Sequence, residues 1–253
     1  MFSLSGFVVG VLVGLTGVGG GSLMTPLLVL LFGISPPTAV GTDLLYAAVT
    51  KSGGILVHAR NRTVDWRIIG RLAAGSVPTT AITIAVLAHI GTKGHAQHSA
   101  ISTVLGIALV LTAAAVLLRR PLQKRLAASD HSLSEAKRAV LTVVLGALLG
   151  VFVSISSVGA GAIGVTVLIV LYPAAPLIRI IGADIAHAVP LTLIAGLGHW
   201  YLGSIDWPML VSLLVGSLPG VAIASQLASH APDRVLRPIM AVLLAIVGLR
   251  LAL

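Results

Sequence analysis

The chain has 253 residues, of which 57% are hydrophobic and only 9% are charged. A soluble domain carries roughly 25% charged residues, so this composition excludes a water-soluble protein. Because the apolar runs are long and continuous, they predict membrane-spanning helices rather than barrel strands. The net charge of +9 lies in a few loops, which indicates membrane topology rather than nucleic-acid binding, and the lack of cysteine excludes disulfides and thiol catalysis.

Eight apolar segments follow one another along the chain. A spanning helix needs about 20 apolar residues to cross a hydrocarbon core of about 30 Å. The first and fifth segments are longer than that, and each contains a cluster of small residues. The segments are 4–32, 38–57, 68–89, 99–118, 139–172, 178–200, 208–229 and 235–253.

The first and fifth segments contain the same interruption. The first reads VLVGLTGVGGGSLMTPLLVLLFG over 11–33, and the second reads VFVSISSVGAGAIGVTVLIVLYP over 151–173. A shift of 140 residues superimposes Gly19 on Gly159. Duplicated apolar segments that are interrupted by glycine are typical of the substrate site of a secondary transporter.

The repeat continues beyond the interruption with a shift of 141 residues, and matches in register indicate an internal duplication. The matched pairs are Gly41 with Gly182, Asp43 with Asp184, Ala47 with Ala188, His58 with His199, Asp65-Trp66 with Asp206-Trp207, and GSVP at 75–78 with GSLP at 216–219. We expect an N-terminal transmembrane repeat over 1–118, a basic linker over 119–138 and a C-terminal transmembrane repeat over 139–253. Ser134 predicts a helix start at Glu135. The paired tryptophans and histidines are expected at the membrane interface.

Loop charge distinguishes two arrangements of the repeats. If each interrupted segment crosses the membrane once, the repeats are parallel, and Lys93, Arg179, Arg234 and Arg237 lie outside. If each is a re-entrant hairpin, the repeats are inverted, and only Lys93 and Arg250 lie outside. Because cationic side chains favour the cytoplasmic side, the second arrangement fits better and places the linker in the cytoplasm. The expected fold is an all-α polytopic helical membrane protein of two inverted repeats, each a glycine-broken re-entrant helical hairpin plus three transmembrane helices.

The two interruptions form a candidate anion site. Non-helical backbone at membrane depth is tolerated only where it is buried in protein or lines a cavity. A helix that restarts after the break directs free N–H groups and a positive dipole end toward that point. The alternative is that the small residues only allow close helix packing. The candidate binding residues here are Thr16, Gly17, Gly19, Gly20, Gly21, Ser22, Ser156, Ser157, Gly159 and Gly161.

Ionisable residues inside apolar segments are further candidates, since a charge at the bilayer centre costs about 2.5–3.5 kcal/mol or more. Lys51 either attracts an anion, pairs with Asp43 or extends toward the interface. Asp43 and Asp184 follow a glycine near the expected start of a helix, where a carboxylate caps free N–H groups or, alternatively, couples transport to protons. Tyr46 and its counterpart His187 are candidate donors to the substrate, and a satisfied core histidine is an equal alternative for His187. We expect no cofactor and no metal site.

These residues resemble the TauE/SafE family of membrane permeases. The resemblance rests on the GVGGGSLMTPLL segment, the AVGTD start of the next helix, the H-x6-DW loop and the GSVP/GSLP segments, and it covers essentially the whole chain. The second half departs from the pattern, since Thr166 stands where the first half has Pro26. The resemblance implies movement of sulfur-containing anions such as sulfite, sulfonates or thiosulfate. It places the substrate region on Gly17, Gly19, Gly20 and Gly21, with Ser157, Gly159 and Gly161 opposite.

The resulting hypothesis is a multi-pass carrier of the cell (inner) membrane that exports a small sulfur oxyanion or organosulfonate by alternating access. An inside-negative potential of 100 mV is worth about 2.3 kcal/mol per charge, so an anion leaves without a coupling ion, whereas uptake needs protons or sodium. Proton-coupled uptake, an anion channel and a non-transporting assembly partner are the alternatives, and the sequence is compatible with a homodimer. An intramembrane enzyme would use Ser22 or Ser157 as nucleophile with His187 as base, but the duplication argues against it.

Overall fold

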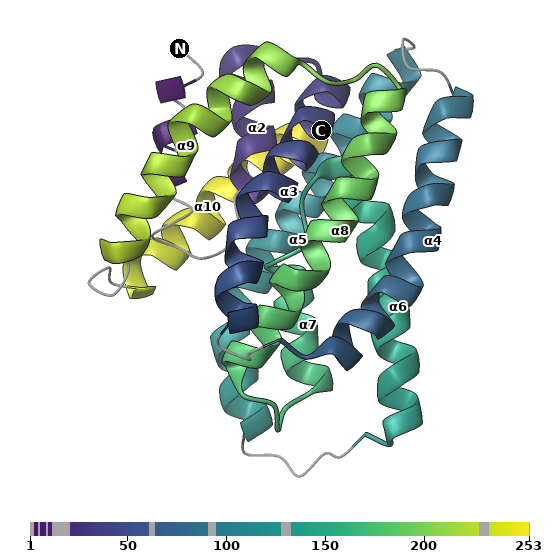
Figure 1. Ribbon diagram of the computed structural model, residues 1–253, viewed down its shortest axis with the longest axis vertical. Helices are drawn as coiled ribbons and strands as arrows, with labels where there is room; N and C mark the ends of the chain where they lie inside the picture. Colours follow the sequence, from purple (N-terminus) through teal and green to yellow (C-terminus); the bar gives the residue numbers. More distant parts are fainter. Residues whose placement is uncertain are drawn as a thin grey trace.

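The computed structural model describes residues 3–4, 6–8, 10–11, 21–60, 64–90, 95–127, 133–227 and 233–252. Within these ranges the ordered elements are all helices, which confirms the predicted all-α class. They are α2 (Gly21–Phe32), α3 (Pro36–Arg60), α4 (Trp66–Ile90), α5 (His95–Ala127), α6 (Glu135–Ser156), α7 (Ile163–Leu171), α8 (Leu177–Tyr201), α9 (Trp207–Leu227) and α10 (Asp233–Ala252), which pack into one bundle (Figure 1).

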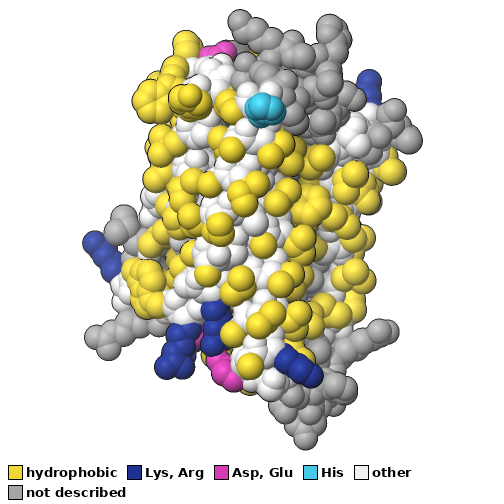
Figure 2. All heavy atoms as spheres, turned by 90° about the vertical axis from the view of Figure 1, so that its right-hand side faces the viewer, with side chains coloured by type: hydrophobic (Ala, Val, Ile, Leu, Met, Phe, Trp, Pro, Cys, Tyr) yellow, Lys and Arg dark blue, Asp and Glu magenta, His cyan; other side chains and the backbone are white. Residues whose placement is uncertain are grey.

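Apolar side chains cover the outside of the bundle. Exposed examples are Val144 and Leu148 of α6 and Val211 and Val215 of α9. Figure 2 shows hydrophobic side chains over the middle of one face, with most of the visible Lys and Arg side chains near its lower end. Four helical segments of the described chain are long and apolar enough to cross a membrane, namely Trp66–His89, Ile101–Arg119, Glu135–Ser156 and Leu177–Tyr201. The protein is therefore a polytopic membrane protein, as the composition predicts.

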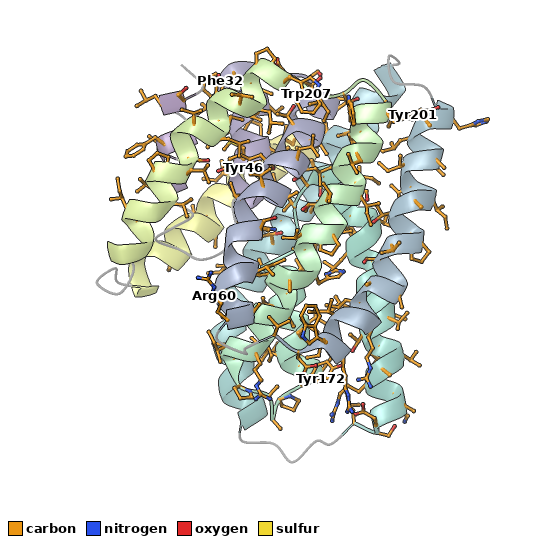
Figure 3. All side chains as sticks on the ribbon, viewed as in Figure 1. Phe32, Tyr46, Arg60, Tyr172, Tyr201 and Trp207 are labelled. Carbon is orange, nitrogen blue, oxygen red and sulfur yellow. The ribbon has the colours of Figure 1, made fainter. Side chains whose placement is uncertain are left out.

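Helices at matched positions of the duplicated sequence run in opposite directions (Figure 3). Phe32, the last residue of α2, lies at the upper end of the molecule, whereas Tyr172, directly after α7, lies at the lower end. In the same view α3 runs downward to Arg60, and its counterpart α8 runs upward to Tyr201. The matched helices of the two halves are therefore antiparallel to one another.

Helices α6 and α7 form a hairpin around the second interruption. The hydroxyl groups of Tyr172, after α7, and Thr142, in the second turn of α6, share a hydrogen bond of 2.9 Å. Helix α7 has nine residues and is therefore about 13 Å long, less than half of a hydrocarbon core of about 30 Å. The chain thus turns back after α6, and α7 returns toward the end from which α6 begins.

A polar network fixes this hairpin to α4 at the lower end of the molecule. Arg71 of α4 forms an ion pair of 2.5 Å with Glu135 and donates a hydrogen bond of 3.1 Å to the hydroxyl of Tyr172. The guanidinium of Arg138 lies 5.5 Å from the centre of the Tyr172 ring. Ser134 caps α6 by accepting the N–H of the residue three positions later, which confirms the helix start predicted there.

Glycines allow α4 and α6 to pack at close range. A Cβ at Gly75 would lie 2.0 Å from the carbonyl oxygen of Val143, and a Cβ at Gly146 would lie 2.1 Å from a carbonyl oxygen of α4. The matched contact between α9 and the N-terminal segment uses the matched glycine, because a Cβ at Gly216 would lie 1.8 Å from the carbonyl oxygen of Ser3. The duplication therefore preserves the same glycine-mediated packing on both sides of the molecule.

The duplicated Asp-Trp pairs begin α4 and α9. Asp65 Oδ1 accepts hydrogen bonds from the N–H groups of Arg67 at 3.0 Å and Ile68 at 3.3 Å. Asp206 Oδ1 accepts the N–H of Met209 at 2.9 Å. Each aspartate therefore supplies an N-cap, which satisfies donors that the helix itself leaves free.

Two helices begin earlier than the sequence predicts. Helix α3 begins at Pro36 and α8 at Leu177, in each case seven residues before the buried aspartate of the pair Asp43 and Asp184. Proline suits the first turn of a helix because its missing N–H would have no partner there. The two aspartates lie inside their helices, too far from the start to cap it, so their expected place near a helix start is wrong.

Candidate functional site

The site is built around the second interruption, because most of the first lies outside the described residues. Thr16, Gly17, Gly19 and Gly20 belong to the part that the structure leaves undescribed, as does the side chain of Ser22. Gly21 is the first residue of α2.

The second interruption is a turn that depends on left-handed backbone. Ser157 ends α6 with φ 58°, and Gly159 and Gly161 have φ 117° and 110°. L side chains rarely adopt the last two values, which explains why glycine occupies both positions. The Ser156 hydroxyl accepts the N–H of Val158 at 3.2 Å and so closes the turn. The hydroxyl of Ser157 is buried and has no hydrogen-bond partner in the described chain.

Asp43 connects α3 to the short helix after the first interruption. Its side chain is fully buried, and its Oδ2 accepts a hydrogen bond of 2.5 Å from Thr25 of α2. The Ser157 side chain lies close enough to interact with the Asp43 carboxylate. Asp43 Oδ1 has no hydrogen-bond partner among the described groups. A carboxylate of the first half therefore faces the interruption of the second half.

Asp184 makes the equivalent contact to the short helix of the second half. Its buried carboxylate interacts with the backbone N–H of Gly161. A Cβ at Gly164 of α7 would lie 2.2 Å from Asp184 Oδ1, so the missing side chain of this glycine lets the carboxylate approach. Each aspartate therefore contacts the half-length helix that follows the interruption in its own half.

Lys51 lies two turns after Asp43 on α3 and interacts electrostatically with Asp43, Asp184 and His187. Its side chain is partly accessible, and it forms no ion pair within 4 Å in the part of the chain that the structure describes. Its counterpart Thr192 is buried and donates a hydrogen bond to a carbonyl of its own helix. At this matched position, therefore, the first half contributes a cation and the second half does not.

Two matched side chains reach across to the opposite half. His187 Nε2 of α8 and the Ser76 hydroxyl of α4 share a hydrogen bond of 2.8 Å. Tyr46 of α3, which is matched to His187, interacts with Ser217 of α9. These two serines belong to the matched segments GSVP and GSLP. Because polar residues at matched positions within apolar helices are unusual, the sequence could have indicated that both serines make polar contacts. Ser157 Oγ and His187 Nδ1 both lack a hydrogen-bond partner in the described chain, so the Ser157–His187 pair of the enzyme hypothesis is not formed in this structure.

His199 makes a further polar contact that the sequence did not predict. It is fully buried, and its Nε2 lies 2.8 Å from the carbonyl oxygen of Ser154. The last carbonyl groups of a helix have no partner within it, and Ser154 is in the last turn of α6. The histidine supplies that partner, so its side chain faces the interior of the bundle.

The buried ionisable residues and the interrupted helix place the protein in the class of polytopic helical membrane proteins with a polar interior, which includes secondary transporters. The family model described as "Sulfite exporter TauE/SafE" matches residues 2–251, and the chain belongs to this family of membrane transporters. The predicted family is therefore confirmed.

Individual relatives agree with this assignment. The chain is 40% identical over 251 residues to the probable membrane transporter protein YjnA of Bacillus subtilis (strain 168), covering 98% of this chain and 97% of that protein. It is 31% identical over 254 residues to the probable membrane transporter protein YdhB of the same organism, covering 97% and 96%. A probable membrane transporter protein of Xylella fastidiosa (strain Temecula1 / ATCC 700964) is 24% identical over 236 residues, covering 89% and 83%. No solved structure matches the chain.

Proposed function

We propose that the protein is a secondary transporter of the cell (inner) membrane that exports a small sulfur oxyanion or organosulfonate, of the sulfite, sulfoacetate or thiosulfate type. The main support for this proposal is the environment of Lys51. This lysine is a partly accessible cation without a close ion-pair partner in the described chain, and it lies among buried polar groups from both halves. The family name supports sulfur as the central atom of the anion.

The proposed binding groups surround Lys51. The ammonium group attracts the anion, and the unpaired hydroxyl of Ser157 donates to one of its oxygens. Helix α7 begins at Ile163, directly after the interruption, so the positive end of its dipole is directed at the interruption. The glycines of the first interruption, Gly17, Gly19, Gly20 and Gly21, would complete the site from the opposite side.

We further propose that the halves are inverted repeats that rock against each other. The opposite directions of matched helices support this arrangement (Figure 3). So do the matched contacts that cross between the halves, His187 with Ser76 and Tyr46 with Ser217. The cationic lower end then faces the cytoplasm, because Lys and Arg favour that side. The potential across the membrane favours export of an anion by about 2.3 kcal/mol per charge at 100 mV, so export requires no coupling ion.

The test is sulfite flux through the purified protein in proteoliposomes. Lys51→Gln keeps a polar side chain but removes the charge, and the flux should fall about 10-fold or more, since hydrogen bonds to charged groups are worth about 1.5–3 kcal/mol. Lys137→Gln is the matched control, because Lys137 is an exposed lysine at the start of α6. Native protein that moves neither sulfite nor a sulfonate, or equal flux in both variants, would contradict the proposal.

A further inference from the structure

An apolar groove lies between α5, α6 and α7, outside the proposed anion site. Its volume is about 530 Å³. The lining residues of α5 and α6 include Leu118 and Leu148, whose side chains are 56% and 53% exposed, whereas Thr166 and Leu171 of α7 are buried. The groove therefore opens toward the surrounding membrane between α5 and α6, and α7 forms its floor.

The lining offers no partner to a small hydrophilic anion. Thr166 is the polar residue among the described side chains that line the groove, and its hydroxyl already donates a hydrogen bond of 3.2 Å to the carbonyl oxygen of Ala115 in α5. The other described lining residues are apolar. A hydrocarbon chain suits such a surface, because it needs no hydrogen-bond partner. This groove is therefore separate from the polar groups around Lys51.

The length of the groove matches one leaflet of a bilayer. Along α6 the lining runs from Leu141 to Phe152. These residues are 11 positions apart, which corresponds to about 16 Å at the helical rise of 1.5 Å per residue. A hydrocarbon core is about 30 Å thick, so the groove is about as long as one leaflet is deep. Because α6 begins at Glu135, at the lower end of the molecule, this is the lower leaflet (Figure 1).

Positive charge lies at the lower end of the groove. Helix α5 continues past Leu118 through RRPLQKRLA, which contains four basic and no acidic residues. On the opposite wall, Glu135 in the first turn of α6 is already paired with Arg71 of α4. Basic charge favours the cytoplasmic side of a membrane, and anionic phospholipids of the cytoplasmic leaflet attract basic segments next to a spanning helix. The groove and its lower end therefore complement the two parts of such a lipid.

We propose that the groove binds an anionic glycerophospholipid of the cytoplasmic leaflet. One acyl chain lies between α5 and α6 against α7, and the phosphate lies at the basic end of α5. A lipid in this position contacts α5 and both helices of the hairpin, so it holds the hairpin that carries the second interruption against the rest of the bundle. This inference goes beyond the proposed function and holds for any transported anion.

The charge favours a lipid over a second copy of this chain as the occupant. In a two-fold symmetric dimer the same surface of both subunits is in contact. Two grooves that face each other would therefore bring two basic ends of α5 together, and these like charges would repel. A phosphate group carries the opposite sign and is attracted to the same end.

The experiment measures lipid binding to the purified full chain in detergent, by native mass spectrometry and by thermal unfolding. Phosphatidylglycerol is compared with phosphatidylcholine that has the same acyl chains. We expect phosphatidylglycerol to bind about 10-fold more tightly at low salt, since two Lys or Arg side chains near the phosphate suffice for that preference. The preference should decrease at high salt, because salt screens exposed charges.

A larger side chain in the groove tests the position of the acyl chain. Ala114 of α5 lines the groove and is exposed, so Ala114→Phe should weaken binding of phosphatidylglycerol about 5-fold or more, because the ring occupies the space of the chain. Ala74→Phe is the matched control, since Ala74 is an exposed alanine of α4 outside the groove. It should bind the lipid like the native protein.

The length of the lipid chain provides a second test in the native protein. Phosphatidylglycerol with six-carbon chains has the same head group, but its chains are too short to fill a groove of about 16 Å. It should bind about 5-fold or more weakly than the long-chain lipid, because it makes fewer packing contacts with the groove.

Equal affinity for the two head groups, or native affinity in Ala114→Phe, overturns the proposal. A change of oligomeric state in Ala114→Phe with unchanged lipid binding also overturns it, since the groove would then be an interface between copies. If Ala114→Phe fails to fold, the comparison of chain lengths decides. Sulfite flux does not enter these measurements, so the lipid site and the proposed function are tested separately.

Discussion

At the scale of single residues, Gly164 controls the approach of Asp184 to the short helix α7. A Cβ at this position would lie 2.2 Å from Asp184 Oδ1, a distance that forces either the carboxylate or the helix to move. We therefore expect Gly164→Ala to reduce anion flux about 10-fold or more, since displacements of about 1 Å in a binding site can reduce activity about 100-fold. The measurement is flux in proteoliposomes.

The control for this change is Gly70→Ala on the exposed face of α4. No atom lies within 4 Å of a Cβ at Gly70, so the alanine should leave flux unchanged. It should also stabilise the helix by roughly 0.5–1 kcal/mol, because glycine is less favourable than alanine in a helix interior. Native flux in Gly164→Ala would show that the Asp184 contact does not matter for transport.

Backbone conformation supplies a second residue-scale prediction, at Gly161. Its φ of 110° lies in a region that side chains rarely adopt. Gly161→Ala should therefore lower the free energy of unfolding by about 1–3 kcal/mol. Gly203→Ala is the comparison, since its φ of 70° lies in the left-handed helical region and a Cβ there meets no atom within 4 Å. Thermal unfolding in detergent measures both, and equal melting temperatures would contradict the described turn.

The sequence predicted some of these residues and missed others for a physical reason. Matching the two halves was sufficient to identify Asp184 and His187, because polar residues at matched positions of apolar segments can be recognised from the sequence alone. The partner of His187 was not predictable, because Ser76 is 111 positions away and meets it only through the packing of α4 on α8. The contact of His199 was not predictable either, because an end-of-helix position indicates depth in the membrane but not which face the side chain occupies.

At the scale of elements, the close packing of α4 on α6 requires glycine at the positions where the two helices touch. A Cβ at Gly75 would lie 2.0 Å from the carbonyl oxygen of Val143, and neither helix backbone can adjust cheaply. Gly75→Val should therefore lower the free energy of unfolding by about 3 kcal/mol or more. Gly70→Val, on the same helix with no atom near a Cβ, should cost less than about 1 kcal/mol. Similar thermal unfolding of the two variants would exclude the close packing of α4 on α6.

Apolar runs predicted where helices cross the lipid more accurately than where they end. The fourth apolar segment stops at residue 118, but α5 continues to Ala127 through the basic sequence RRPLQKRLA. Arginine, lysine, leucine and glutamine are good helix formers, so the helix extends beyond the hydrophobic stretch. Hydropathy locates the part of a helix that lipid surrounds, whereas propensity and capping decide its length. The start of α6 was predictable because Ser134 is a local capping signal.

At the scale of the whole molecule, the two halves are similar in framework and different in chemistry. Both halves have the buried aspartate, the Asp cap and the glycine at the close helix contact. The position of Lys51, in contrast, is taken by Thr192 in the second half, and that of Tyr46 by His187. In the proposed transport cycle, this shared framework would let both halves undergo the same motion. Lys51 would make the proposed anion binding asymmetric, so we expect the first half to contribute most of the affinity.

The orientation of the halves leads to a prediction at this scale. Arg60 and Tyr201 occupy matched positions 141 residues apart, yet they lie toward opposite ends of the molecule (Figure 3). Both side chains are exposed, and the native chain has no cysteine. A single cysteine at either position is therefore the sole target of a membrane-impermeant maleimide, and the unmodified protein serves as the unlabelled control.

Tyr201→Cys should react in intact cells. Arg60→Cys should react only in inside-out vesicles, because the arginines near Arg60 favour the cytoplasmic side of the membrane. Reaction of both cysteines from the same side would require parallel repeats and would exclude rocking about a pseudo-two-fold axis in the membrane plane.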